Sequence, residues 1–331
     1  MKFQKINKLF FAFVLSFALI LASCSEDSSN DPSVSESEVL IEYLEANGDF
    51  VNTAAPPIIK ADAVYSAVKT SPDDIYIIDI RSAEDFGKGH IEGAVNVTVG
   101  DLLSHVESVG ITGYDKVVIV CYSGQTASFS AAALRMLGHT NVYTMKWGMC
   151  SWNPDFAGSW PKNINNSRVT QMEYTVNEKP AAGSMPEINT GNSDGMAIAK
   201  ARAEVIMTQG FDEAKISSDE VFANTDNYFI VNYWPMSLYE SAGHIPGAYC
   251  YEPKTSLKST AFLNTLPTDK PIVVYCYTGQ TSASVAAFLR LMGYDAKSLL
   301  FGTNGMMYDK MVETSSPSWK DTEIHEYEYV D

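Results

Sequence analysis

Two segments of the chain repeat one pattern, and each places a cysteine directly after an apolar stretch. The first cysteine is Cys121 and the second is Cys276. Aligned from cysteine to the closing glycine, at Gly138 and Gly293, 10 of the 18 positions are identical. Each segment predicts a buried strand, a short polar loop and a helix. A thiol is thereby placed at the carboxyl end of a strand and the amino end of a helix, where an anion is stabilised.

The sequence around both segments alternates between strand and helix patterns. Strands are predicted at 75–80, 116–120 and 141–145, and again at 228–231 and 272–275. Helices are predicted at 38–46, 61–69, 101–109 and 126–137, and again at 196–208, 217–223 and after Cys276. Such alternation indicates an α/β fold with a parallel sheet covered by helices on both faces.

The length of 331 residues exceeds one ordinary core and favours two domains. Residues 163–194 are rich in Asn, Ser, Pro, Gly and Glu and are interpreted as a linker. The linker separates a first repeat, residues 38–162, from a second repeat, residues 195–331.

The amino-terminal residues predict a targeting signal. Three lysines precede an apolar run of 13 residues from Leu9 to Leu21, which is too short to cross a bilayer. The run ends in Leu-Ala-Ser-Cys at Cys24, which resembles a bacterial lipobox. We therefore expect a lipoprotein signal peptide at 1–23, lipidation at Cys24 and a polar tether at 24–37. This implies a lipid-anchored protein of the cell envelope, at the periplasmic face or the cell surface. An ordinary cleaved signal, with Cys24 unmodified, is the alternative.

The formal net charge of −17 argues against a nucleic-acid partner, because phosphates require a basic surface. Four cysteines remain beyond Cys24, with no CxxC pair and no metal-ligand spacing, so neither a disulfide scaffold nor a zinc site is predicted. Cys150 and Cys250 lie outside the repeated segments. They are interpreted as packing residues, with a resolving thiol as the alternative.

Further motifs recur in the same order in both halves, and together they resemble the rhodanese family of sulfurtransferases. In the first repeat the motifs are Asp79-Ile80-Arg81, Gly89 to Ala94 and the six-residue loop from Cys121 to Thr126. In the second they are Gly243 to Ala248 and the loop from Cys276 to Thr281. The resemblance implies two rhodanese-like domains, each with a parallel five-stranded sheet and helices on both faces.

The resemblance also implies an activity and its site. Cys121 and Cys276 are the expected catalytic residues, each carrying sulfane sulfur as a persulfide. The donor is thiosulfate, a persulfide or a polysulfide, and the acceptor is cyanide or a thiol, such as that of a thioredoxin-like protein. No metal and no cofactor are implied. The alternative is a non-catalytic or thiol-redox interaction module on the cell envelope.

A glycine-containing turn before a helix directs backbone N–H groups at one point, which predicts an anion site and a lowered thiol pKa. The expected substrate-binding loops comprise Tyr122, Ser123, Gly124, Gln125 and Thr126, and then Tyr277, Thr278, Gly279, Gln280 and Thr281. The glycines fit turn positions, and helix capping is an equal alternative role for the threonines. The neutral loop side chains favour a persulfide or polysulfide donor over thiosulfate. Six loop residues, against seven in the family's phosphatase relatives, argue against phosphatase chemistry.

Other motif residues are predicted to be structural. Asp79 and Arg81 are expected to form an ion pair, and His90 and His244 are expected to support the Gly-His turns rather than act as bases. The second repeat has Asn232-Tyr233-Trp234 in place of the Asp-x-Arg motif, so we expect its shape there to differ.

Overall fold

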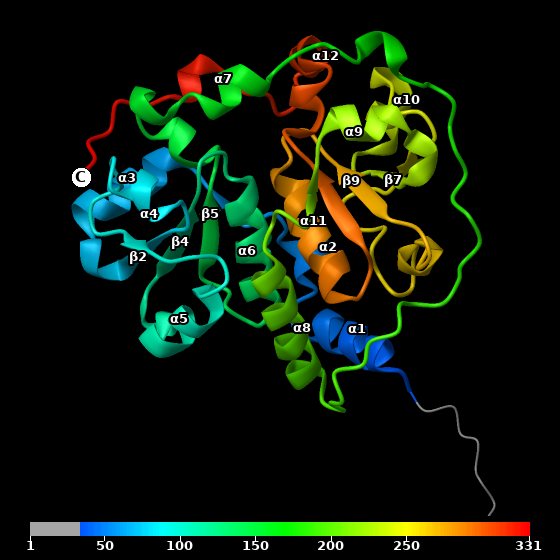
Figure 1. The fold of residues 1–331 in the computed structure, drawn as a ribbon, viewed down its shortest axis with the longest axis horizontal. Coiled ribbons are helices and arrows are strands. Elements are labelled where there is room, and N and C mark those ends of the chain that lie inside the picture. The colour runs from blue at the N-terminus through cyan, green and yellow to red at the C-terminus, as the bar shows by residue number, and fades with distance from the viewer. Residues whose placement is uncertain (1–33) are drawn as a thin grey trace, which may run out of the picture. The chain divides into compact units, whose positions relative to one another are not determined.

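The computed structural model describes residues 34–331. The predicted signal peptide, Cys24 and residues 25–33 of the tether lie outside the described residues, and the last two tether residues belong to the first helix, Glu36–Ala46. The described part contains two parallel five-stranded sheets with helices on both faces, so the predicted fold class is confirmed (Figure 1). None of its helices is long and apolar enough to cross a bilayer.

The two sheets have the same topology. The first has the order β1-β5-β4-β2-β3 and the second the order β6-β10-β9-β7-β8, with every neighbouring pair parallel. The strands of the first repeat are β1 (Ile58–Ile59), β2 (Ile75–Asp79), β3 (Val95–Asn96), β4 (Lys116–Val120) and β5 (Val142–Met145). Those of the second repeat are β6 (Lys215–Ile216), β7 (Phe229–Asn232), β8 (Tyr249–Cys250), β9 (Ile272–Tyr275) and β10 (Ala296–Leu299).

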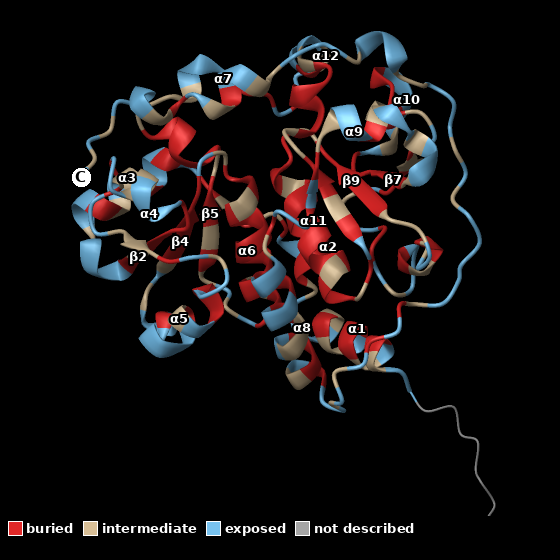
Figure 2. Ribbon diagram, in the orientation of Figure 1, coloured by how far each residue is buried: buried red, intermediate tan, exposed pale blue. Residues whose placement is uncertain are grey.

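The central strands form because their residues are apolar and mostly β-branched. In β4, Val117, Val118 and Ile119 are fully buried, and β9 is buried along its whole length. Burial on both faces is the expected environment of a parallel strand between two helical layers. Figure 2 shows this as mostly red central strands in both repeats.

Helices flank both sheets. Those before the second sheet are α1 (Glu36–Ala46), α2 (Phe50–Thr53), α3 (Ala61–Thr70), α4 (Ala83–Phe86), α5 (Leu102–Val109), α6 (Gln125–Met136) and α7 (Ser159–Asn163). The others are α8 (Gly195–Gln209), α9 (Ser218–Ala223), α10 (Met236–Ala242), α11 (Gln280–Leu291) and α12 (Tyr308–Glu313). Helix α1 begins two residues earlier than predicted, because Ser35 and Glu38 form a capping box around its first turn.

One apolar cluster joins the two repeats. Helices α6 and α11 pack against each other at the centre of the described part, and α1 packs against α8 (Figure 1). Small side chains such as Ala132 and Ala287 lie in this cluster. The hydroxyl of Ser284 on α11 also donates to the carbonyl of Ser128 on α6, 3.2 Å away. The repeats are therefore continuous through their cores rather than separately closed.

The segment that follows each repeat binds the other repeat. After the first repeat, Glu173 of residues 163–194 forms an antiparallel bridge with His244, with both N···O distances at 2.8 Å. After the second, Val330 forms the same bridge with His90, at 2.8 and 2.9 Å. The predicted linker residues thus form backbone contacts with the second repeat.

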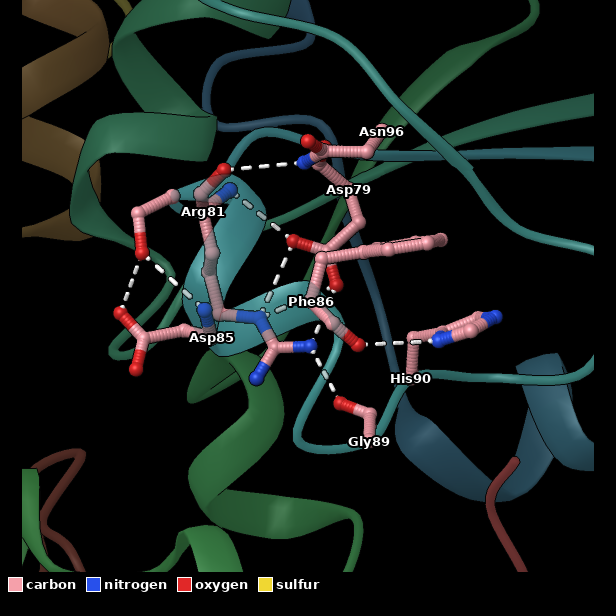
Figure 3. A network of polar contacts seen from close by, with 8 residues as sticks. Asp79, Arg81, Asp85, Phe86, Gly89, His90 and Asn96 are labelled. Carbon is pink, nitrogen blue, oxygen red and sulfur yellow. Dashed lines mark hydrogen bonds and ion pairs between the residues drawn. The ribbon is translucent and has the colours of Figure 1, made fainter. Parts of the chain in front are cut away.

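The predicted Asp79–Arg81 ion pair is confirmed. Arg81 Nη2 lies 2.6 Å from Asp79 Oδ2, and both side chains are 1% exposed. Arg81 Nη2 also donates to the carbonyl of Gly89 at 2.7 Å, which ties strand β2 to the Gly-His turn (Figure 3). In that turn His90 Nδ1 lies 3.0 Å from the carbonyl oxygen of Phe86, and the two rings stack. These contacts support the structural role expected of His90.

The C-terminal segment, residues 320–331, is expected to stabilise the first repeat. Tyr327 stacks on Tyr65 with ring centroids 4.0 Å apart and meets the edge of Trp152. Tyr327→Ala should lower the free energy of unfolding by about 2 kcal/mol through lost aromatic contact. Urea unfolding measures this, with Glu326→Ala at a neighbouring exposed position as the control. Equal stability of the two variants would contradict the packing role of this segment.

Candidate active site

The two cysteine loops are built in the same way. Cys121 follows β4 and precedes α6, while Cys276 follows β9 and precedes α11. The N-cap residues are Gly124 and Gly279, with φ of 82° and 80°, a conformation that glycine adopts readily. Neither helix has a capping side chain, so the alternative role of the threonines as caps is wrong.

Backbone N–H groups surround the sulfur of Cys121. Its Sγ accepts hydrogen bonds from Gly124 N at 3.2 Å and Ala127 N at 3.3 Å. This is the geometry expected of an anion-binding loop. The pKa of Cys121 is nevertheless raised, because burial of the thiol outweighs the N–H groups of Ala127, Gly124 and Ser123 that lower it. The expected lowered pKa is therefore wrong for this closed site, since the sequence pattern did not reveal that the thiol is only 5% exposed.

The sulfur of Cys276 has different neighbours. Its Sγ accepts from Ser282 N at 3.3 Å and lies 3.5 Å from Ser282 Oγ. That hydroxyl is 2.8 Å from Ser298 Oγ. In the first repeat the position of Ser282 is taken by Ala127, which brings no hydroxyl to the sulfur. Cys276 is 1% exposed, so its loop is the more closed of the two.

A cavity of about 360 Å³ opens beside Cys121. Most of the predicted first loop lines it, together with residues before the loop and residues of the second repeat. The lining residues are Ile80, Arg81, Ser82, Cys121, Tyr122, Ser123, Gln125, Thr126, Phe211, Lys215, Leu300 and Phe301. Tyr122 is 39% exposed at this cavity. The wall is therefore shared by both repeats.

The charges of this cavity come from outside the loop. Arg81 and Lys215 line it, and no carboxylate is among its lining residues. The guanidinium of Arg81 lies 5.5 Å from the centre of the Tyr122 ring. The neutral loop sequence thus gives an incomplete account of the site, because the tertiary structure adds two cations. The Asp-x-Arg motif marked Arg81 in the sequence, but nothing there marked Lys215.

The two loop glutamines cross from one repeat to the other. Gln125 Oε1 accepts from the backbone N–H of Phe301 at 2.8 Å, and Gln280 Oε1 accepts from that of Trp147 at 3.4 Å. Gln280 Nε2 also donates to the carbonyl of Gly124 at 3.4 Å. Gln280 therefore points towards the first repeat. Gln125 makes the equivalent contact with the second repeat and also lines the cavity.

Aromatic residues replace the Asp-x-Arg motif in the second repeat. Asn232 Nδ2 donates to Tyr275 Oη at 2.8 Å, and that oxygen also accepts from Ile245 N. Trp234 stacks on Tyr277 with ring centroids 5.2 Å apart. The predicted difference in shape is present here as a neutral, aromatic arrangement.

The predicted residues of the second loop are mostly enclosed. Thr278, Gly279 and Gln280 are buried, while Tyr277 and Thr281 are partly buried. In the nearby turn, His244 stacks on Tyr239, and its Nδ1 lies 3.1 Å from the Tyr239 carbonyl oxygen. These contacts support the structural role expected of His244.

Cys150 and Cys250 are both free and buried. Cys150 lies in a cluster with Trp147, Trp160 and Trp319. Cys250 Sγ donates to the carbonyl of Trp234 at 3.5 Å. Burial raises the pKa of each thiol to about 11. These environments agree with the packing interpretation.

The raised pKa values predict that stability falls in mildly alkaline solution. Between about pH 9 and 11 the unfolded thiols of Cys150 and Cys250 lose protons that the folded thiols keep, so unfolding becomes more favourable. Each thiol should contribute a slope of about −1.4 kcal/mol per pH unit. In urea unfolding, the free energy of unfolding of Cys150→Ala and of Cys250→Ala should depend less steeply on pH than that of the unmodified chain. The tyrosines contribute equally in all three proteins, so they do not affect this comparison. The same pH dependence in the variants and the unmodified chain would contradict the raised pKa values of Cys150 and Cys250.

Comparison with known proteins identifies the domains. A family model described as "Rhodanese-like domain" matches residues 60–155 and 223–306, which is more than half of the chain. The Putative sulfur carrier protein YrkF of Bacillus subtilis is 27% identical over 119 residues, covering 35% of this chain and 63% of that protein. The chain thus spans just under two thirds of that relative.

Other relatives have names that refer to sulfur transfer. Thiosulfate sulfurtransferase GlpE of Shewanella oneidensis is 33% identical over 85 residues, covering 25% of this chain and 81% of that protein. A solved Thiosulfate sulfurtransferase from Pseudomonas aeruginosa is 16% identical, with a TM-score of 0.30, covering 87% of this chain and 49% of that one. That TM-score is too low to inform on function.

Proposed function

Because the chain belongs to the rhodanese family, we propose that it is a sulfurtransferase that carries sulfane sulfur on a cysteine persulfide. One observation above all supports this. The sulfur of Cys121 accepts two backbone N–H hydrogen bonds beside a cavity whose charged lining residues are both cations. The N–H groups suit a sulfur anion, and Lys215 suits an anionic donor, whereas the charge of Arg81 is already balanced by Asp79.

The first half-reaction transfers one sulfur atom to the enzyme. The thiolate of Cys121 attacks the outer sulfur of the donor, an S–S bond forms, and the donor's own bond to that sulfur breaks. With thiosulfate the electron pair leaves on sulfite, and with a persulfide it leaves on a thiolate. The N–H groups of Gly124 and Ala127, which donate to the Cys121 sulfur, are proposed to hold the new terminal sulfur anion as well.

The second half-reaction returns Cys121 to its starting state. A thiol or cyanide attacks the terminal sulfur of the persulfide, and the electron pair returns to the cysteine sulfur. A thioredoxin-like protein is the proposed thiol acceptor. The exposed Tyr122 at the cavity provides a surface that an acceptor would meet first.

Cys276 is proposed as a second, slower sulfur site. It has the same loop pattern, but it is almost fully buried and has the Ser282 hydroxyl beside its sulfur. This enclosure and the raised pKa of Cys121 favour the non-catalytic form of the alternative function, because thiol-redox chemistry also needs a thiolate. Direct measurement of persulfide formation distinguishes the two functions.

We propose that Cys24 is lipidated and anchors the protein in the cell envelope, facing the periplasm or the cell surface. The support is the sequence alone: three lysines, a 13-residue apolar run and a cysteine after Leu-Ala-Ser.

Intact-mass measurement tests the sulfur-carrier proposal. Reduced protein exposed to thiosulfate or a persulfide donor should gain one sulfur mass at Cys121 and, more slowly, a second at Cys276. Cys121→Ser should abolish the fast gain and Cys276→Ser the slow one. Cys250→Ala, at a buried thiol outside both loops, should leave both unchanged. Full sulfur transfer by the double serine variant would show that the nucleophiles are wrongly assigned, and disulfides instead of persulfides would support the redox module.

Cell fractionation tests the anchor. Cys24→Ala should move the protein from the membrane fraction to the soluble fraction, because the attachment point of the lipid is removed. Ser25→Ala should leave it membrane-bound. Persistent membrane association of Cys24→Ala would rule out the lipid anchor.

A further inference from the structure

We propose that Lys215 of the second repeat determines the donor specificity of Cys121 in the first repeat, so that both repeats complete one active site. This rests on the proposed sulfurtransferase function. It goes beyond it by assigning a charge-recognising role to a residue outside the motifs of either loop.

The position of Lys215 follows from the sheet. Lys215 begins β6, where it pairs with Ser298 of β10. Strand β10 leads directly to Leu300 and Phe301, which line the same cavity. The close packing of α6 on α11 brings this edge of the second sheet to the loop of the first repeat. The cation is thus placed by contacts between the repeats, and not by the Cys121 loop.

The equivalent position in the first repeat carries no charge. Ile58 pairs with Thr144 in the first sheet as Lys215 pairs with Ser298 in the second. The first repeat thus has no cation at this position, and its Lys146, at the position of Leu300, pairs with Glu323 at 2.9 Å. In addition, Trp234 of the second repeat occupies the position that Arg81 has in the first repeat.

The two cations at the cavity differ in how firmly they are held. Arg81 is fixed by Asp79 and by the carbonyl of Gly89, and Figure 3 shows its other terminal nitrogen without a contact to the residues drawn. Lys215 pairs with Asp212, whose side chain is 86% exposed. An ion pair this exposed is weak, so the ammonium group can turn to a bound anion at little cost.

This arrangement suits a donor that carries negative charge away from the sulfur it transfers. In thiosulfate the outer sulfur is attacked at Cys121, and the sulfonate end becomes sulfite as the S–S bond breaks. A cation across the cavity from the loop would bind that end and stabilise the leaving anion. A donor with one negative charge fewer would gain less from Lys215.

Two donors of different charge test the proposal on the full-length chain. Thiosulfate is a dianion, whereas methanethiosulfonate is a monoanion that transfers the same sulfur and leaves methanesulfinate. Lys215→Gln should lower kcat/KM about tenfold for thiosulfate and only about threefold for methanethiosulfonate. Lys215→Arg should restore most of the activity, and raised ionic strength should slow the unmodified enzyme more than Lys215→Gln.

Lys310→Gln is the matched control. Lys310 pairs with Glu313 three residues away, as Lys215 pairs with Asp212, but it does not line the cavity. Lys310→Gln should leave kcat/KM unchanged for both donors. An equal loss with both donors, or no loss with either, would overturn the role of Lys215 as long as the unmodified chain gains sulfur at Cys121. If the unmodified chain gains no sulfur from any donor, the proposed function itself fails.

Discussion

The close approach of the two cysteine loops is the constraint on which the rest of the arrangement depends. A side chain at Gly124 would collide with Gln280, and one at Gly279 would collide with Gln125. Both glycines also have positive φ, which other residues adopt only under strain, and a side chain there would displace the amide ends of the two glutamines. With the loops this close, each glutamine reaches a backbone N–H of the other repeat. The cavity beside Cys121 is a consequence, because the second repeat forms part of its wall.

The repeated sequence predicts the α/β fold and the strands before the two cysteines well, since β4 and β9 are apolar and followed by the same loop, but it did not indicate the inner strand β10. The edge strands β1 and β6 contain two residues each, too few for a periodic pattern, and the sequence did not indicate them. The site is predicted only in part. Local sequence locates Cys121 and its N–H groups, but the burial that raises its pKa, the crossing of Gln280 and the position of Lys215 all arise from packing between residues distant in the chain.

The two repeats have kept one backbone arrangement with different chemistry at the same place. In the first, a buried ion pair holds the strand end against the Gly-His turn, and breaking it is expected to cost about 3–5 kcal/mol. In the second, Tyr275 Oη joins Asn232 to Ile245, and Trp234 stacks on Tyr277. This uncharged arrangement needs no buried ion pair, and it puts Trp234 where the first repeat has Arg81. Divergence at a structural motif thus makes the two thiol environments unequal.

The segment that follows each repeat binds the other repeat, and this exchange has a consequence for biosynthesis. The first repeat is bridged at His90 by Val330, and its outer core includes Tyr327 and Tyr329, more than 200 residues further along the chain. A nascent chain that has emerged only as far as the first repeat lacks these partners and leaves that apolar surface uncovered. Contacts of such long sequence separation slow folding and prolong exposure to aggregation. Vectorial emergence, from a ribosome or through a translocation channel, therefore yields a finished first repeat only after the second has been delivered.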